Sequence, residues 1–204
     1  MRVIGITGGI GTGKSYIMQI FAQSGFPTYS ADQRAKQLME EDEIVRQKLR
    51  ELLGKEAYLP DGRLNRSHVA KHIFQNPELR LQINQIVHPH TIADFQRWVH
   101  AHALEGHKAV FKEAALTLEA GGYFSVDILM VVYAPLKVRI QRLQQRDGLS
   151  EEEILNRIRS QWPEWKKIAH ADFVLINDGV LPVEPQLRAF CEKYDLPVPP
   201  IFAR

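Results

Sequence analysis

The chain has 204 residues, of which 45% are hydrophobic and 25% are charged, and its formal net charge is +2. This size and composition are typical of a globular protein with a substantial apolar core and argue against a disordered chain. A net charge this small gives no sign of a nucleic-acid partner.

The expected compartment is the cytoplasm. No apolar run approaches the roughly 20 residues of a membrane span, and the N-terminal apolar run is typical of a strand rather than of a cleavable signal. The single cysteine, Cys191, excludes an internal disulfide framework and fits a reducing compartment. Without a motif around it, we expect Cys191 to be an inert thiol.

The first predicted elements are a buried strand over residues 3–6 and a glycine-rich segment directly after it. The segment from Gly8 to Ser15 has the complete G-x-x-x-x-G-K-[ST] pattern of a P-loop. Glycines can take positive φ angles and turn backbone N–H groups inward, which makes a concave site for phosphate oxygens. We expect these angles at Gly8, Gly11 and Gly13.

The last two residues of this segment, Lys14 and Ser15, are expected to complete the phosphate site. Lys14 is expected to reach the β and γ phosphates of ATP. Ser15 opens the next helix, whose N-terminus adds a positive dipole, and its hydroxyl is a candidate ligand of the Mg²⁺ that accompanies ATP. The predicted ATP-binding residues here are Gly9, Ile10, Gly11, Thr12, Gly13, Lys14, Ser15 and Tyr16.

A second strand is predicted over residues 26–29. Asp32 follows this strand and is therefore expected at the C-terminal edge of the sheet, where open α/β sheets bind their ligands. Asp32 is therefore a candidate base for an attacking hydroxyl. An aspartate just before an amphipathic run is also typical of a helix N-cap, and it can serve both roles.

Residues 33–107 have a mostly helical pattern. This stretch is too long for a plain crossover between strands, so we interpret it as an inserted, substrate-facing subdomain. The residue before a proline is biased toward extended geometry, so we expect His88 at a break between helices, facing a cleft; a backbone-bonded turn residue is the alternative. His68 and His72 lack a third ligand and are expected on a surface helix.

The second half of the chain continues the alternation of strands and helices. Strands are predicted over 109–111 and 126–134, the latter nearly continuous in apolar residues, as in a parallel strand covered on both faces. A helix over 135–145 and a second helix with a capping box at Ser150 follow. A last strand over 172–176 precedes a final helix and a proline-rich tail that we expect to be loose.

Arg139, Arg142 and Arg146 recur at spacings of three and four, so they share one face of the predicted helix. Such a stripe is usually a solvated surface. Beside a nucleoside triphosphate, however, arginine forks suit phosphate, and the stripe lies just before a segment that we interpret as a mobile lid. We therefore expect Arg139 and Arg142, with Arg146 as a further candidate, to close over the transferring group.

The whole pattern predicts an α/β, three-layer P-loop NTPase fold with a mainly parallel, doubly wound sheet. The segment at Asn177 lacks the guanine-reading Asn-Lys-x-Asp pattern of GTPases, and no second apolar strand ends in the Asp-Glu pair of motor ATPases. A small-molecule kinase fits best. Another nucleotide or metabolite kinase, and a regulatory nucleotide-binding module without its own chemistry, are the alternatives.

A set of motifs resembles the dephospho-CoA kinase family over about residues 2–180. Besides the P-loop, which many kinases share, the motifs are Ala31-Asp32, Asp61-Gly62, Asn65-Arg66, Ile73-Phe74, His88-Pro89, Glu119-Ala120-Gly121, Arg146-Asp147, Gln161 and Ala171-Asp172. The resemblance implies transfer of the ATP γ-phosphate to the ribose 3′-hydroxyl of dephospho-coenzyme A, the last step of coenzyme A synthesis. It gives no oligomeric state.

The resemblance also implies an organisation and a set of residue roles. One P-loop kinase unit would consist of a core (about 1–32, 108–147 and 168–195), a helical insertion on the coenzyme A side (about 33–107) and a lid (about 146–167). The catalytic residues would be Lys14, Asp32, Arg139 and Arg142. Asn177 and Gly179 would lie near adenine. The substrate would contact Thr7, Asp32, His88, Leu116 and Glu119.

The chain departs from the family pattern at two places. Ser30 stands where many members have the first aspartate of Asp-Ala-Asp, and Ala115 stands where many have the proline of Pro-Leu-Leu-Phe-Glu. The second aspartate, Asp32, is retained. We expect these departures to affect details of the substrate loop and not the activity.

Overall fold

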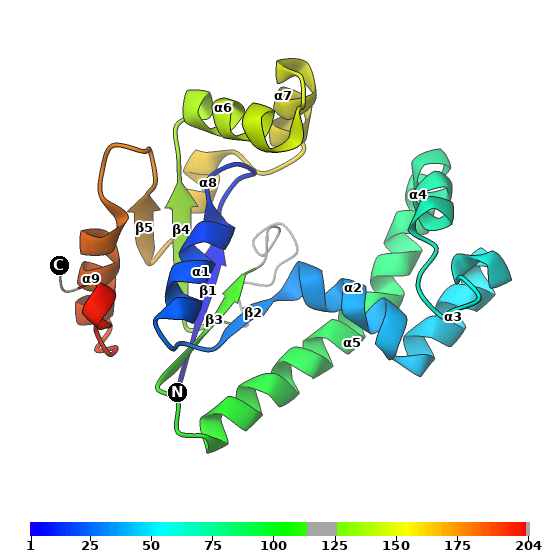
Figure 1. The fold of residues 1–204 in the computed structure, drawn as a ribbon, viewed down its shortest axis with the longest axis horizontal. Coiled ribbons are helices and arrows are strands. Elements are labelled where there is room, and N and C mark those ends of the chain that lie inside the picture. Colours follow the sequence, from blue (N-terminus) through cyan, green and yellow to red (C-terminus); the bar gives the residue numbers. More distant parts are fainter. Residues whose placement is uncertain (114–125, 203–204) are drawn as a thin grey trace. The chain divides into compact units, whose positions relative to one another are not determined.

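The computed structural model describes residues 1–113 and 126–202, and for residues 73–75 and 77 it describes the backbone only (Figure 1). The chain forms two compact units. None of the described helices combines the length and the apolar character needed to cross a membrane.

The first unit combines Met1–Ser30 with Ala101–Arg204 and contains the sheet, and the second unit, Ala31–His100, is built from helices. Five strands form one sheet with the order β2-β3-β1-β4-β5, and every pairing is parallel. The strands are β1 (Arg2–Thr7), β2 (Thr28–Ser30), β3 (Ala109–Glu113), β4 (Ile128–Tyr133) and β5 (Phe173–Ile176). The predicted parallel α/β sheet is thus confirmed, with β1 at its centre (Figure 1).

The described helices of the first unit follow β1, β4 and β5 along the chain. They are α1 (Lys14–Gln23), α6 (Leu136–Asp147), α7 (Glu151–Arg159), α8 (Glu164–Ile168), α9 (Val183–Lys193) and the 3-10 helix η3 (Pro200–Phe202). The predicted capping box at the start of α7 is present: the N–H of Glu153 donates to the hydroxyl of Ser150 at 3.3 Å, and the N–H of Ser150 donates back to the Glu153 carboxylate at 2.9 Å.

Both faces of the sheet are covered. Along β4, Ile128, Met130 and Val132 pack into one core with side chains of α1 and α9. Leu129 and Val131 point to the opposite face and pack with residues at and around α8. This burial on both sides explains why β4 is a continuous apolar run and agrees with a doubly wound sheet.

The second unit has its own core. Its helices are α2 (Ala31–Glu41), α3 (Glu43–Leu53), η1 (Lys55–Ala57), α4 (Arg66–Gln75) and α5 (Pro77–Leu104), the last of which continues into the first unit. Asp42 caps α3 by accepting hydrogen bonds from the N–H groups of Ile44 and Val45 at 3.0 and 3.1 Å. Val45, Leu49 and Leu53 then recur every four residues and form the buried face of α3.

The expected helix break at His88 is wrong. The helix α5 continues through Pro89, although a proline inside a helix removes a hydrogen bond and costs about 3 kcal/mol. The reason is a buried face that repeats every four residues on both sides of the proline: Ile83, Val87, Thr91 and Phe95. His88 and Pro89 lie on the exposed side, so packing keeps the helix continuous.

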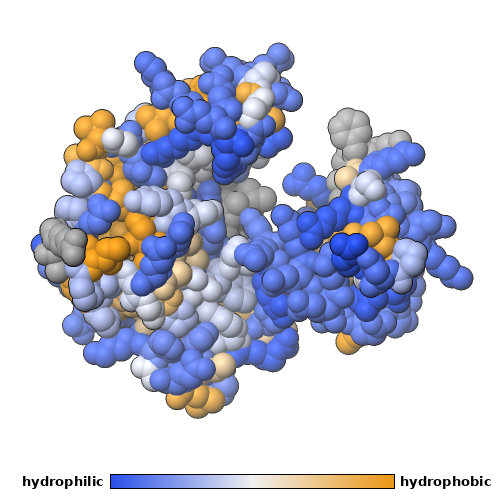
Figure 2. Space-filling view, in the orientation of Figure 1, coloured by the Kyte–Doolittle hydropathy of each residue, from blue (hydrophilic) through white to orange (hydrophobic). Residues whose placement is uncertain are grey.

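The expectation of a loose tail is also wrong for its described residues, which end at Phe202. Phe202 is fully buried, and its ring meets that of Phe21 edge to face, with the centroids 6.0 Å apart. The Nε of Arg188 on α9 donates a hydrogen bond to the carbonyl of Phe202. Figure 2 shows hydrophobic residues on the surface around α9, and the neighbouring Ile201 is exposed. The proline-rich segment therefore returns the chain to the core.

Because Phe202 fills the core, we expect Phe202→Ala to lower the free energy of unfolding by about 3 kcal/mol. Ile201 is 48% exposed, so Ile201→Ala is a matched control with an expected change of at most about 0.5 kcal/mol. Urea unfolding followed by circular dichroism measures both variants. Equal effects of the two substitutions would contradict the packing of the tail.

Candidate nucleotide-binding site

The P-loop joins the central strand β1 to α1. The φ angles of Gly8, Gly11 and Gly13 are +151°, +81° and +94°, which confirms the predicted positive values. Gly13 is the N-cap residue of α1, so Lys14 and Ser15 begin the helix. The loop therefore has the strand–turn–helix geometry that binds phosphate through backbone N–H groups and a helix N-terminus.

Gly9 and Gly13 lack a Cβ atom, and side chains from later in the chain pack against the loop at these two positions. A Cβ atom at Gly9 would lie 2.1 Å from Oε1 of Glu164 and 2.4 Å from Nη2 of Arg139. A Cβ atom at Gly13 would lie 2.2 Å from Nδ2 of Asn177. These distances are far below van der Waals contact, so a larger residue would displace the groups that hold the loop.

Arg139 and Arg142 of α6 bind carbonyl groups of the P-loop. The Nε of Arg139 donates to the carbonyl of Ile10 at 2.7 Å, and Nη1 of Arg142 donates to that of Thr12 at 3.3 Å. The Nδ2 of Asn177 donates to the same Thr12 carbonyl at 2.8 Å, and its Oδ1 accepts from Arg142 at 3.2 Å. The three side chains thus hold the loop from its carbonyl side.

Arg139 is a buried cation. Its side chain is 3% exposed, and its Nη1 lies 2.9 Å from Oε1 of Glu164. Burial lowers the pKa of Arg139, and the Glu164 carboxylate opposes this; an arginine nevertheless keeps its charge. Its Nη2 is buried and has no hydrogen-bond partner among the described residues. Arg139 therefore retains a donor suited to a phosphate oxygen.

Lys14 brings a second cation to the loop. Its Nζ donates hydrogen bonds to the carbonyls of Gly8 and Gly9 at 2.9 and 3.1 Å. Burial lowers the pKa of Lys14 to about 8; the negative charge of Glu113 opposes this shift, and the positive charge of Lys167 adds to it. The site therefore concentrates positive charge where a triphosphate would supply the compensating negative charge.

The structure adds three side chains for which no role is predicted from the sequence. Lys167 of α8 is fully buried, Glu113 ends β3, and Oε1 of Gln161 accepts a hydrogen bond from the N–H of Ile10 at 2.9 Å. Glu113 could have been found, because an acidic residue after an apolar strand lies at the ligand-binding edge of the sheet. Lys167 could not, because a lysine in a charged stretch looks like a surface residue.

Ser15 and Glu113 form a pair of oxygen ligands. The hydroxyl of Ser15 donates to Oε1 of Glu113 at 2.9 Å. Glu113 pairs in register with Ile6 of β1 and with Ser30 of β2, so it lies at the C-terminal edge of the sheet. Hydroxyl and carboxylate oxygens are ligands that Mg²⁺ prefers. The pair fits the Mg²⁺ role predicted for Ser15 and adds Glu113 as a second candidate.

A pocket of ≈ 480 Å³ lies beside the P-loop. It is lined by Ile10, Gly11, Gly13, Lys14, Ser15, Tyr16, Arg142, Leu143, Arg146 and Asn177. The structure thus brings most of the predicted ATP-binding residues together. Gly179 is not among these lining residues of the described chain, and Arg146 also pairs with Asp147 at 2.8 Å.

The predicted substrate residues are distributed over both units. Thr7 is fully buried at the end of β1, and its hydroxyl has no hydrogen-bond partner among the described residues. Asp32 is the second residue of α2, inside the first turn rather than at the cap. His88 is exposed on α5, and Leu116 and Glu119 lie outside the described residues.

Similarity to known proteins extends over most of the chain. The family model for dephospho-CoA kinase matches residues 2–182. The chain belongs to the dephospho-CoA kinase family. A dephospho-CoA kinase from Bacteroides fragilis is 38% identical over 185 residues, which are 90% of this chain and 88% of that protein.

Two solved structures have the same fold as this family member. A crystal structure from Thermus thermophilus is 33% identical with a TM-score of 0.75, over 95% of this chain and 96% of that chain. A dephospho-CoA kinase from Campylobacter jejuni is 27% identical with a TM-score of 0.68, over 95% and 94% of the two chains. The resemblance predicted from the motifs is therefore confirmed.

In the nucleotide-free and metal-free protein, we expect the amine of Lys14 to titrate at a pH of about 8, because burial disfavours its charged form. In an NMR titration of lysine side chains, the midpoint of Lys14 should lie well below the ordinary lysine value of about 10.4. Lys14→Arg should remove the shifted signal, and Lys137→Arg, at an exposed position, should leave it. A Lys14 midpoint above about 10 would contradict the account.

Proposed function

We propose that this protein transfers the γ-phosphate of ATP to the ribose 3′-hydroxyl of dephospho-coenzyme A, the last step of coenzyme A synthesis. The observation that carries the proposal is the match to the dephospho-CoA kinase family over residues 2–182. A P-loop surrounded by buried cations supports the ATP side of the reaction. ATP and dephospho-coenzyme A are the proposed partners, and a cytoplasmic location stays a prediction.

The phosphate side of the proposed mechanism relies on positioning and charge. Phosphoryl transfer has a loose transition state in most analyses, so the enzyme must align the groups and neutralise negative charge. Lys14 and the loop N–H groups would hold the β and γ phosphates, with Arg139 and Lys167 adding positive charge. Ser15 and Glu113 would hold Mg²⁺, which supplies further charge neutralisation when bound.

The proposed lid is the segment of about residues 146–167, which contains α7 and most of α8. Gln161 accepts the hydrogen bond of the Ile10 N–H, and Glu164 pairs with Arg139. A triphosphate would replace Gln161 as the acceptor of that N–H, because inward N–H groups of a P-loop bind phosphate oxygens. We assign the adenine contacts to residues 177–179, which follow β5.

Asp32 is the proposed base for the 3′-hydroxyl. β2 ends at Ser30, which pairs in register with Glu113 at the C-terminal edge of the sheet, and Asp32 follows two residues later. A carboxylate at hydrogen-bond distance would orient the hydroxyl for attack and accept its proton. Further contacts with the coenzyme stay predictions for Thr7, His88, Leu116 and Glu119.

We expect Asp32→Asn to lower kcat by at least about 100-fold, because the amide cannot accept the hydroxyl proton. ATP affinity should stay within about twofold, since the substitution leaves the P-loop unchanged. Glu41→Gln, at the other end of the same helix, is the control and should leave both values unchanged. A coupled assay of ADP release and calorimetry with ATP measure them. Turnover within about tenfold of wild type would show that Asp32 is not the base.

The proposed acceptor is tested by comparing phosphate acceptors with labelled ATP. We expect transfer to dephospho-coenzyme A, with no transfer to nucleoside monophosphates or sugars. Preferred turnover of one of these other acceptors would indicate a different metabolite kinase. ATP binding without acceptor-dependent ADP release would instead indicate a regulatory nucleotide-binding module.

A further inference from the structure

The helix α5 ends in a Schellman turn in the first unit. The N–H of Gly106 donates to the carbonyl of Ala103 at 3.1 Å, and the N–H of His107 donates to that of His102 at 3.2 Å. Gly106 has a φ angle of +83°, the left-handed conformation that this motif requires. The two hydrogen bonds fix the path of the chain from the last turn of α5 to the residue before Lys108.

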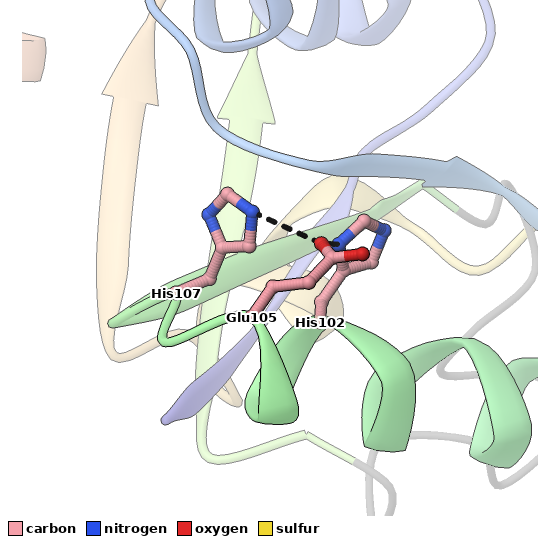
Figure 3. A group of neighbouring side chains, drawn as sticks. All are labelled: His102, Glu105 and His107. Carbon is pink, nitrogen blue, oxygen red and sulfur yellow. Dashed lines mark hydrogen bonds and ion pairs between the residues drawn. The ribbon is translucent and has the colours of Figure 1, made fainter.

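This turn brings three metal-ligating side chains together. In a Schellman motif, the residue after the glycine usually makes a hydrophobic contact with the helix position to which its N–H is bonded. Here both positions are histidines: the ring centroids of His102 and His107 lie 5.2 Å apart. Oε2 of Glu105 lies 2.7 Å from Nδ1 of His102 and 3.4 Å from Nε2 of His107 (Figure 3).

The three donor atoms have a spacing close to that of a metal site. One ligand atom from each of His102, Glu105 and His107 lies within 4.8 Å of the other two. Ligands about 2.1 Å from a tetrahedral zinc ion lie about 3.4 Å from one another, so small rotations of the exposed Glu105 and the partly buried His102 and His107 side chains are sufficient. Among the described residues, no other histidine, cysteine or carboxylate set meets this condition.

We propose that His102, Glu105 and His107 bind a divalent transition-metal ion, with Zn²⁺ as the preferred ion and water completing its coordination. Two imidazole nitrogens and one carboxylate oxygen are a ligand set that suits zinc, whereas Mg²⁺ prefers oxygen ligands only. The backbone hydrogen bonds of the turn fix the relative positions of the ligands, which lowers the entropy cost of assembling the site.

The proposed site is separate from the nucleotide site. It lies just before β3, whose first residue, Ala109, pairs with Arg2 at the start of β1. The P-loop follows the opposite end of β1, which is six residues long, so the two sites lie about 20 Å apart along the sheet. An ion here would join the end of α5 to the loop before β3 and stabilise the folded chain.

Another histidine pair provides a matched control. The rings of His68 and His72 have centroids 4.2 Å apart, closer than those of the proposed site. However, Nε2 of His68 is hydrogen-bonded to the carbonyl of Leu53, and Nδ1 of His72 is hydrogen-bonded to the carbonyl of His68. The pair belongs to no three-ligand group among the described residues. Removing one histidine of this pair should therefore not affect the proposed site.

The test is calorimetric titration of Zn²⁺ into the full chain, stripped of metal with EDTA, without nucleotide and with excess Mg²⁺ to occupy oxygen sites. We expect saturable binding of one ion per chain. Loss of a group that only hydrogen-bonds a metal ligand weakens metal affinity by about 10- to 100-fold. His107→Ala and Glu105→Gln each remove a proposed ligand itself, so each should weaken Zn²⁺ binding by at least about tenfold. His72→Ala should stay within about twofold of wild type.

Two further measurements separate loss of the metal ligands from loss of the fold. Circular dichroism in EDTA should show that His107→Ala is folded like wild type, since the side chain of His107 is 35% exposed and its backbone N–H, which closes the turn, is kept. Co²⁺ added in place of Zn²⁺ should give visible absorption bands of a nitrogen- and oxygen-ligated ion, and His107→Ala should lose them. Equal Zn²⁺ affinity of wild type and His107→Ala, or no saturable binding by wild type, would overturn the proposal.

Discussion

The nucleotide site depends on hydrogen bonds to the carbonyl groups of the P-loop. Its glycines at positive φ angles turn N–H groups toward the phosphate position, so the carbonyls of Ile10 and Thr12 need donors from elsewhere. Arg139, Arg142 and Asn177 supply them from α6 and from the residue after β5. The shape of a loop near the N-terminus is therefore maintained by the second half of the chain.

The same interactions concentrate positive charge around the loop. Arg139 and Lys167 are buried, and burial together with the charge of Lys167 disfavours the charged form of Lys14. Glu113 and Glu164 compensate only part of this charge. The negative charge of a triphosphate would complement this local positive charge, although the protein as a whole has a net charge of only +2.

Local features of the sequence predicted the fold and the conformation of the P-loop well, and features set by distant contacts were predicted poorly. The conformations of β4 and of the P-loop are determined by their own residue types, the apolar run in β4 and the glycines in the loop. In contrast, the continuity of α5 across Pro89 depends on burial of the opposite face of the helix, and the ordered tail depends on a core position for Phe202. The arginine stripe was recognised, but its bonds to loop carbonyls require the tertiary fold.

The central claim is that phosphate is transferred to the ribose 3′-hydroxyl of dephospho-coenzyme A. The most direct test is to incubate the protein with ATP, Mg²⁺ and dephospho-coenzyme A and to locate the new phosphate by phosphorus–proton NMR coupling. The account predicts a phosphate monoester coupled to the ribose H3′, with one ADP formed per product molecule. A phosphate at another position, or ADP formed without a phosphorylated acceptor, would contradict it.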